Sequence, residues 1–282
     1  MSTAQQTITI LMIGDLVGKP GRALFSTHIG RLRAQYAPDC VVVNGENSAG
    51  NGRGITAGIV EFLLKSGADV ITSGNHIFGQ KGYTAAFAAS DRLLRPLNFP
   101  SECPGKGYVL FTTLSGITLA VVNAQGRVFM HEQLACPFKG IESLLTYLKT
   151  QTKLIFLDFH AETTSEKQGM GFFLDGKITA QVGTHTHVQT ADERVLPKGT
   201  GYITDLGCCA SQNSMLGMNI HSVLSRMITQ LPSKFEVEEN GPFALHGVVI
   251  KAEVATGKTI SIERIKIIEP NLIINHETTG KE

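Results

Sequence analysis

The chain has 282 residues, of which 42% are hydrophobic and 17% are charged, and these proportions suit a globular protein with a sizeable core. The formal net charge of +1 excludes a global field that would draw the protein to nucleic acid or to an anionic membrane surface. A phosphate-bearing substrate would therefore have to be held locally, by metal ions or by a few placed donors.

The cysteines are odd in number and irregularly spaced. They are Cys40, Cys103, Cys136, Cys208 and Cys209. No Cys-x-x-Cys pair occurs, which argues against a zinc ribbon or a thioredoxin-type motif, and we expect reduced thiols. The N-terminal stretch has no basic n-region, and the apolar run Ile8–Ile13 is too short for a signal sequence or a membrane span. We expect a cytoplasmic protein without membrane attachment.

The N-terminal part alternates between strand and helix patterns. In chain order the predicted elements are a strand at Ile8–Ile13, a helix at Gly21–Tyr36, a strand at Cys40–Val43, a helix at Ala57–Ser66 and a strand at Ala68–Thr72. Pro20 stands where a helix can begin, Thr56 can cap the second helix, and Gly67 can end it. The pattern predicts a βαβαβ unit with a mainly parallel sheet.

The rest of the chain is predicted to add hairpins and further helices. Helices are expected at Gly82–Ala89, Phe138–Lys149, Thr163–Phe173 and Ile220–Gln230, and strands at Tyr108–Thr113, Ile117–Val122, Leu154–Phe159, Ile178–Val182, Arg194–Leu196, Gly201–Thr204, Gly247–Val254 and Thr259–Ile268. The two hairpins favour antiparallel pairing in the second half. We predict one domain with two packed sheets over residues 1–270, followed by a polar, frayed tail over 271–282.

The turn after the first strand, Gly14–Lys19, looks like a phosphate loop. The Walker pattern requires four residues between its glycines and a Ser or Thr after the lysine. Here three residues intervene and Pro20 follows Lys19, so the P-loop interpretation fails. An auxiliary phosphate role for this turn stays open, because a helix N-terminus can hold an anion.

Polar side chains follow five of the predicted strands, at the point where each strand ends. They are Asp15, then Glu46 and Asn47, then Asn75 and His76, then His160, and finally His185 and His187. Carboxylates, amides and imidazoles without a thiolate suit iron, manganese or zinc. The set is larger than the three or four ligands of one catalytic zinc ion, so two metal ions roughly 3.5–4 Å apart fit it better.

Each member of this set also has a simpler interpretation. Asp15 can cap a turn, and Asn47 suits the Gly/Asn-rich loop in which it lies. Glu46 is poorly explained by turn chemistry. His185 and His187 are two residues apart, so on an extended chain both imidazoles point to the same side. Their position after a strand, with His160 at the end of the preceding one, favours a metal site.

In order and approximate spacing, these motifs resemble those of the calcineurin-like metallophosphoesterases. The matching segments are Gly14-Asp15, Gly45-Glu46-Asn47, Gly74-Asn75-His76, His160 and Gly183-Thr-His185-Thr-His187. Two departures are informative. The usual Asp-x-His opening is Asp15-Leu16-Val17 here, and the usual bridging Asp is Glu46, with Asn47 beside it. Together with Asn123–Arg127, Phe159–Lys167 and Thr204–Gly207, the pattern resembles the YmdB-like branch, although Gly207–Ser211 differs from the Gly-Met-Cys-Gly usual there.

The resemblance implies a fold, an α/β/β/α sandwich of two packed mixed sheets flanked by helices. It also implies a dinuclear centre, in which Asp15, Glu46, Asn47 and His187 hold one metal ion, Glu46 bridges, and Asn75, His160 and His185 complete the second. Iron is the expected metal, with manganese or zinc as alternatives. His76 would be a general acid beside the metals, and Arg127 is a candidate phosphate clamp.

The activity implied by the resemblance is a phosphodiesterase acting on cyclic nucleotides, 2′,3′-cyclic and also 3′,5′-cyclic, through a metal-activated hydroxide. A nucleotide or protein monoester phosphatase is the alternative within the enzyme class. A metal-bearing regulatory or RNA-associated protein with incidental hydrolysis is the alternative outside it, although the near-neutral charge argues against a large nucleic-acid footprint. We also expect a homo-oligomer, a dimer or a tetramer.

Overall fold

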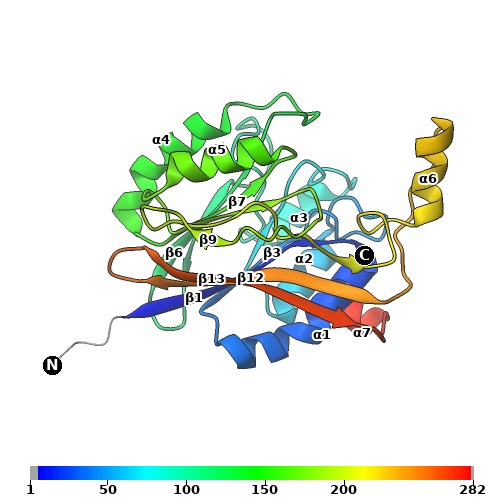
Figure 1. Cartoon of the computed structure of the whole chain (residues 1–282), viewed down its shortest axis with the longest axis horizontal. Coiled ribbons are helices and arrows are strands. Elements are labelled where there is room, and N and C mark those ends of the chain that lie inside the picture. Colours follow the sequence, from blue (N-terminus) through cyan, green and yellow to red (C-terminus); the bar gives the residue numbers. More distant parts are fainter. Residues whose placement is uncertain (1–5, 281–282) are drawn as a thin grey trace.

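Strands and helices alternate along residues 6–280, which are the residues that the computed structural model describes (Figure 1). The strands are β1 (Thr7–Ile13), β2 (Asp15–Leu16), β3 (Cys40–Asn44), β4 (Val70–Thr72), β5 (Tyr108–Thr112), β6 (Thr118–Gln125), β7 (Ile155–His160), β8 (Ala180–Thr184), β9 (Arg194–Val195), β10 (Gly201–Ile203), β11 (Cys208–Ser211), β12 (Phe243–Glu253) and β13 (Thr259–Glu269). The helices are α1 (Gly18–Tyr36), α2 (Ala57–Ser66), α3 (Tyr83–Ala89), α4 (Pro137–Gln151), α5 (Thr164–Leu174), α6 (Ile220–Thr229) and α7 (His276–Thr279).

Two mixed sheets pack face to face, and helices cover their outer faces. The first sheet has the strand order β2-β11-β12-β1-β3-β4, with β13 paired to β12, and the second has the order β5-β6-β7-β8-β10-β9. Helices α4 and α5 lie on the outer side of the second sheet, and α1 and α7 lie on the outer side of the first (Figure 1). The predicted α/β/β/α sandwich is confirmed.

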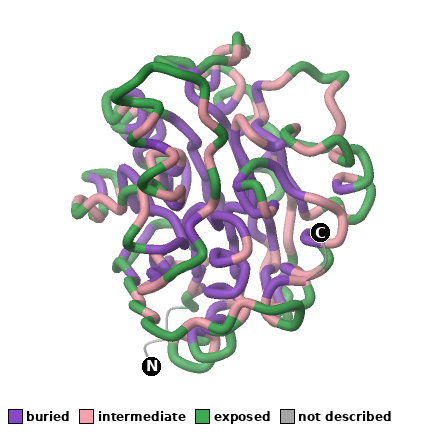
Figure 2. The backbone as a smooth tube through the Cα atoms, turned by 90° about the vertical axis from the view of Figure 1, so that its right-hand side faces the viewer, coloured by how far each residue is buried: buried purple, intermediate pink, exposed green. Residues whose placement is uncertain are grey.

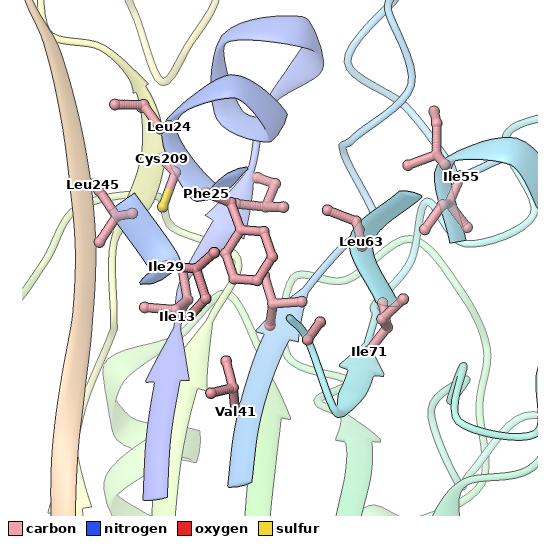
Figure 3. Packing of buried hydrophobic residues seen from close by; sticks show 14 of the residues in the cluster. Ile13, Leu24, Phe25, Ile29, Val41, Ile55, Leu63, Ile71, Cys209 and Leu245 are labelled. Atoms are coloured by element: carbon pink, nitrogen blue, oxygen red, sulfur yellow. The ribbon is translucent and has the colours of Figure 1, made fainter. Parts of the chain in front are cut away.

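Strand β1 shows why the central strands have continuous apolar sequences. Successive side chains of a strand point to opposite faces. Ile10 and Met12 pack in the cluster between the two sheets, whereas Leu11 and Ile13 pack in the cluster that includes α1. Phe25 of α1 lies over this second cluster (Figure 3). Because both faces are covered, every position of the strand favours an apolar residue.

The local signals for the second helix are confirmed. The Thr56 side chain accepts a hydrogen bond from the Ile59 backbone N–H, and Gly67 follows the last helical residue with a φ of 123°. That φ value lies in the region that L-residues rarely adopt, so glycine is the favourable residue there. Helix α1 begins at Gly18, earlier than predicted, and Pro20 lies in its first turn. In the phosphate-loop-like turn, Lys19 pairs with Glu239 at 3.7 Å.

The expected dominance of antiparallel pairing in the second half is wrong for the second sheet. The hairpins β5–β6 and β12–β13 are antiparallel as predicted, but β6, β7, β8 and β10 run parallel to one another. Helices α4 and α5 supply the crossovers that parallel neighbours require. The carboxyl ends of β7 and β8 consequently lie at the same edge of their sheet.

The expectation of a frayed tail is also wrong for residues 271–280. Helix α7 docks on α1, where the Arg22 Nε donates to the Thr279 carbonyl at 2.6 Å and the Ser26 hydroxyl donates to the Thr278 carbonyl at 2.8 Å. Thr279 is buried. Tertiary contacts therefore order a segment whose polar sequence suggested none. Residues 281 and 282, and Met1–Gln5 of the polar N-terminus, lie outside the described residues.

Burial is concentrated in the central strands, and exposed residues lie in loops, on outer helix faces and on the strands β9 and β13 (Figure 2). All five cysteines are free thiols, and Cys40, Cys208 and Cys209 are buried, in agreement with the prediction of reduced cysteines. No helix within residues 6–280 is both long and apolar enough to cross a membrane. The single-domain organisation over residues 1–270 stays a prediction.

Candidate metal centre

The polar residues that follow the strands meet where the carboxyl ends of the two sheets come together. The parallel strands β1, β3 and β4 bring Asp15, Glu46 and Asn75 from the first sheet. The parallel strands β7 and β8 bring His160 and His185 from the second. Because carboxyl ends of parallel strands share one edge, residues far apart in the sequence become neighbours.

Glu46 lies at the centre of this group and is fully buried. Its Oε1 lies 3.1 Å from both the His160 Nε2 and the Asn47 Nδ2, and its Oε2 accepts the His76 backbone N–H at 2.9 Å. Burial by itself would raise the pKa of this carboxyl, but His160 and the His76 backbone N–H outweigh it and lower the pKa to about 2. Glu46 is thus held as a carboxylate, whose oxygens can accept hydrogen bonds or bind cations from several directions.

A hydrogen-bond relay from Asp158 through Thr184 orients the His160 ring, and the sequence alone did not indicate it. The Thr184 hydroxyl donates to the Asp158 Oδ1 at 2.7 Å and lies 2.9 Å from the His160 Nδ1. With its proton committed to Asp158, Thr184 accepts from the His160 Nδ1–H. The His160 Nε2 then faces the centre, where its N–H donates to the Glu46 Oε1 at 3.1 Å and lies 3.0 Å from the Asn75 Oδ1 and 3.1 Å from the His185 Nδ1. A bound cation would take the place of that Nε2 proton. The Thr184 partner fixes the tautomer that a metal-binding imidazole needs.

Thr184→Val should test this relay, because valine keeps the shape and removes the hydroxyl. We expect metal affinity to fall by about 10–100-fold, the range for lost partners of metal-binding residues, as measured by metal titration. Thr72→Val is the matched control, since the Thr72 hydroxyl donates to the other oxygen of Asp158 at 2.5 Å without contacting His160. Both variants should lose about 1–3 kcal/mol of unfolding free energy. Equal metal affinity in the two variants would contradict the relay.

Glycine at position 74 permits the close approach of His160. A Cβ atom there would overlap the His160 ring, well inside van der Waals contact, and the ring could not shift without leaving Glu46. Any side chain at this position would therefore displace the imidazole. This packing requirement explains the first residue of the Gly74-Asn75-His76 motif.

The loop after β8 holds His185 and His187 in strained backbone conformations. Their φ values are 97° and 63°, in the left-handed region, and non-glycine residues there cost about 1–3 kcal/mol each. The His187 Nδ1–H donates to the Leu216 carbonyl at 2.9 Å, and its Nε2 accepts from the Asn47 Nδ2 at 3.1 Å. The His185 Nε2 lies 2.9 Å from a Glu162 carboxylate oxygen, so its Nδ1 faces the centre.

A buried ion pair between Lys167 and Asp205 supports this strained loop. The Lys167 Nζ donates to the Asp205 Oδ2 at 2.6 Å, and both side chains are fully buried. The same Asp205 carboxylate accepts the Thr186 backbone N–H at 3.1 Å and the Thr186 hydroxyl at 2.7 Å. Asp205 therefore fixes the residue between the two histidines, and Lys167 compensates its buried charge.

The arrangement fits bound cations. The Asp15 Oδ1 is buried and accepts no hydrogen bond from any described residue, and an unsatisfied buried carboxylate oxygen is costly. Burial raises the pKa of Asp15 to about 7 while that of Glu46 is lowered, a divergence typical of functional sites. Ligand atoms of Glu46, His160 and His185 all lie within 4.8 Å of one another. A cation among them would satisfy the Asp15 oxygen and the imidazole lone pairs.

Not every predicted site residue lies in this group. His76 is half-buried and lines the cavity that opens beside the centre, together with Glu46, Asn47, His185 and His187. The Arg127 side chain is exposed and does not line that cavity, although the Arg127 backbone N–H donates to Glu166. Its role as a phosphate clamp stays a prediction without a supporting contact.

The residues that sequence reasoning missed are Asp158, Glu162, Lys167, Thr184 and Asp205. Asp158 falls inside β7, where only its charge in an otherwise apolar setting could have drawn attention, whereas Lys167 lies in a polar stretch of α5.

Comparisons with known proteins find similar sequences and similar folds. Residues 11–265 match the family model described as YmdB-like protein. The chain is 44% identical over 263 residues to the 2′,3′-cyclic-nucleotide 2′-phosphodiesterase of Bacillus subtilis (strain 168), covering 93% of this chain and 98% of the relative. A novel phosphatase from Mycoplasma pneumoniae superposes with a TM-score of 0.88 at 35% identity, covering 95% of each chain. A hypothetical protein from Thermus thermophilus superposes with a TM-score of 0.86 at 34% identity, covering 93% of this chain and 100% of the other.

Proposed function

The chain belongs to the YmdB-like protein family and is a hydrolase of phosphate esters, and from this premise we propose that it hydrolyses 2′,3′-cyclic nucleotides at a dinuclear metal centre. The observation that carries the proposal is the convergence of five strand ends on one buried cluster with an unsatisfied carboxylate oxygen. The similarity to the Bacillus subtilis phosphodiesterase supports the substrate class. Action on 3′,5′-cyclic nucleotides belongs to the same proposal.

Two cations would be held by residues from both sheets. We assign Asp15, Asn47 and His187 to one ion and Asn75, His160 and His185 to the other, with Glu46 shared between them. The mixture of carboxylate, amide and imidazole donors suits iron, with manganese or zinc as alternatives. When bound, the ions supply Lewis acidity that lowers the pKa of water and neutralises phosphate oxygens.

The protein's own groups then complete the reaction. A water oxygen bonds to phosphorus, one bond between phosphorus and a ribose oxygen breaks, and the proton goes to that ribose oxygen. His76 is the donor we propose, because its ring lines the cavity while its backbone N–H is committed to Glu46. Burial lowers the pKa of His76, so the ring is mainly neutral at neutral pH. It would take up the proton that the attacking water releases and then donate a proton to the departing ribose oxygen, which returns the ring to its neutral form.

A substrate panel tests the proposed function. Protein stripped with a chelator and reloaded with Fe²⁺, Mn²⁺ or Zn²⁺ should hydrolyse adenosine 2′,3′-cyclic phosphate, and the stripped protein should not. The panel should also contain adenosine 3′,5′-cyclic phosphate, bis-p-nitrophenyl phosphate and p-nitrophenyl phosphate. We expect a preference for the 2′,3′-cyclic diester over the monoester of at least about 10-fold in kcat/KM, equivalent to about 1.4 kcal/mol.

Two results would redirect the proposal. Faster turnover of the monoester would support a monoester phosphatase, and the absence of metal-dependent turnover of every substrate would favour a metal-bearing binding protein. Metal content measured on the same samples separates a loss of metal from a loss of chemistry. A cytoplasmic location and a homo-oligomeric assembly stay predictions.

A further inference from the structure

The cavity beside the metal centre extends well beyond the proposed ligands. Its volume is about 720 Å³, toward the upper end of the ~300–1,000 Å³ found for small-molecule sites. The catalytic end is lined by Glu46, His76 and the two loop histidines, and the opposite wall is built by α6 and the segment that follows it. Helix α6 stands away from the body of the protein (Figure 1), and its residues Val223, Arg226 and Met227 line the cavity.

The far part of the cavity is positively charged. Arg226 and Lys234 line it, Arg53 lines the cavity nearer to His76, and Glu46 at the metal end is the one carboxylate among the described residues that line the cavity. No ion pair within residues 6–280 involves any of these three cations. This concentration of positive charge is local, since the whole chain carries a formal net charge of +1. Three uncompensated cations in one cavity favour an anionic ligand.

The same wall offers an aromatic platform. The Arg226 guanidinium lies 5.4 Å from the centre of the Phe235 ring, and Met227 of α6 is 58% exposed toward the opening. A half-buried aromatic ring beside an arginine is the arrangement on which nucleobases stack. The combination of stacking surface and cations is typical of sites for single-stranded nucleic acid.

A cyclic mononucleotide does not account for these features. It carries one phosphate, and that is the group that the metal ions would neutralise. It has no second phosphate for Arg226 and Lys234 to bind. A nucleotide joined to the 5′ side of the reacting one would supply both a second phosphate and a second base. The far wall therefore matches a substrate longer than one nucleotide.

We propose that the cavity under α6 binds the nucleotide preceding the scissile one, so that the preferred substrate is a short oligoribonucleotide ending in a 2′,3′-cyclic phosphate. Phe235 stacks on the preceding base, and Arg226 and Lys234 hold the linking phosphate. The inference rests on the proposed function and specifies its substrate class. It requires contact with one or two nucleotides only, which agrees with the near-neutral surface.

The test compares adenosine 2′,3′-cyclic phosphate with the dinucleotide adenylyl-adenosine ending in a 2′,3′-cyclic phosphate, using metal-loaded protein. We expect kcat/KM to be at least about 10-fold higher for the dinucleotide, since one stacked base contributes about 5–150-fold. Phe235→Ala and Arg226→Gln should each remove most of this advantage and change turnover of the mononucleotide by less than about two-fold. The dissociation constant of adenylyl-adenosine 3′-phosphate should rise in parallel.

The chain provides a matched control pair elsewhere on its surface. Phe172 of α5 is 55% exposed and has the Arg194 guanidinium 5.9 Å from its ring centre, and neither residue lines the cavity. Phe172→Ala and Arg194→Gln should leave the ratio between the two substrates unchanged. Thermal unfolding of all four variants identifies any loss of activity that arises from misfolding.

Three outcomes separate this inference from the proposed function. Equal efficiency on the two substrates would overturn the inference and leave the function intact. If Phe235→Ala and Arg226→Gln lowered kcat/KM by the same factor for both substrates, the inference would also be overturned. That result would mean that this wall of the cavity contacts the reacting nucleotide. Failure of the loaded wild-type protein on both substrates and on bis-p-nitrophenyl phosphate would instead contradict the proposed function.

Discussion

Glu46→Gln is expected to reduce metal-dependent hydrolysis of cyclic and activated diesters to the level of the metal-free protein. The loss should exceed the ~10²–10³-fold caused by removing one preorganised hydrogen-bond donor, because a shared ligand serves both ions. Glutamine keeps the length and shape of glutamate but replaces one oxygen by an NH₂ group. That group would face either the His160 Nε2 or the His76 backbone N–H, both of which now lie beside a carboxylate oxygen.

The measurement is metal content together with turnover of adenosine 2′,3′-cyclic phosphate, on protein whose folding is verified by circular dichroism. Glu61→Gln is the matched control, because Glu61 is exposed on α2 and, among residues 6–280, pairs with Lys65 alone at 3.5 Å. Exposed pairs of this kind contribute little, so that variant should match wild type in both measurements. Undiminished turnover in Glu46→Gln, with two ions bound, would rule out the bridging role.

His76→Ala is expected to keep the metal stoichiometry and to lower kcat by about 10²–10⁴, the range for acid–base groups. Alanine retains the backbone N–H that donates to the Glu46 Oε2, so the substitution should not disturb that carboxylate. The effect should depend on the leaving group. A ribose alkoxide needs a proton, whereas p-nitrophenolate leaves without one, so bis-p-nitrophenyl phosphate should be affected much less.

The decisive comparison is kcat for the two substrates in His76→Ala and in His276→Ala, a control on α7 that lies outside the cavity lining. An equal loss on both substrates would argue against proton donation by His76. A loss of bound metal would make His76 a ligand instead. Either result would leave the family membership and the assignment of Glu46 untouched.

Local patterns in the sequence were sufficient to predict most elements and the positions at which site residues follow strands. The cap at Thr56 and the end at Gly67 depend on side-chain and backbone preferences within a few residues, which is why both were predicted at the right position. The strand-end residues were recognised because a polar side chain directly after a buried strand stands out from its surroundings. The resemblance then supplied the order of the motifs.

Long-range contacts could not be predicted in this way. Asp158 lies within the apolar pattern of β7, and its role depends on Thr184 in β8, on Thr72 in β4 and on the parallel pairing of β7 with β8. The docking of α7 on α1 depends on Arg22 and Ser26, more than 250 residues away in the chain. Neither relation leaves a local periodic signal, because each is created only when distant elements pack together.

The sequence by itself determined which residues can serve as ligands and that they follow strands, since side-chain chemistry and strand periodicity are local properties. Only the tertiary structure decided that two sheets meet at their carboxyl ends, that the Asp15 Oδ1 accepts no hydrogen bond from the described residues, and that α6 and the segment after it bring Arg226 and Phe235 to the cavity beside the centre. The physical reason is that burial and proximity arise from packing between distant segments, and these set the charge, orientation and reach of every group in the site.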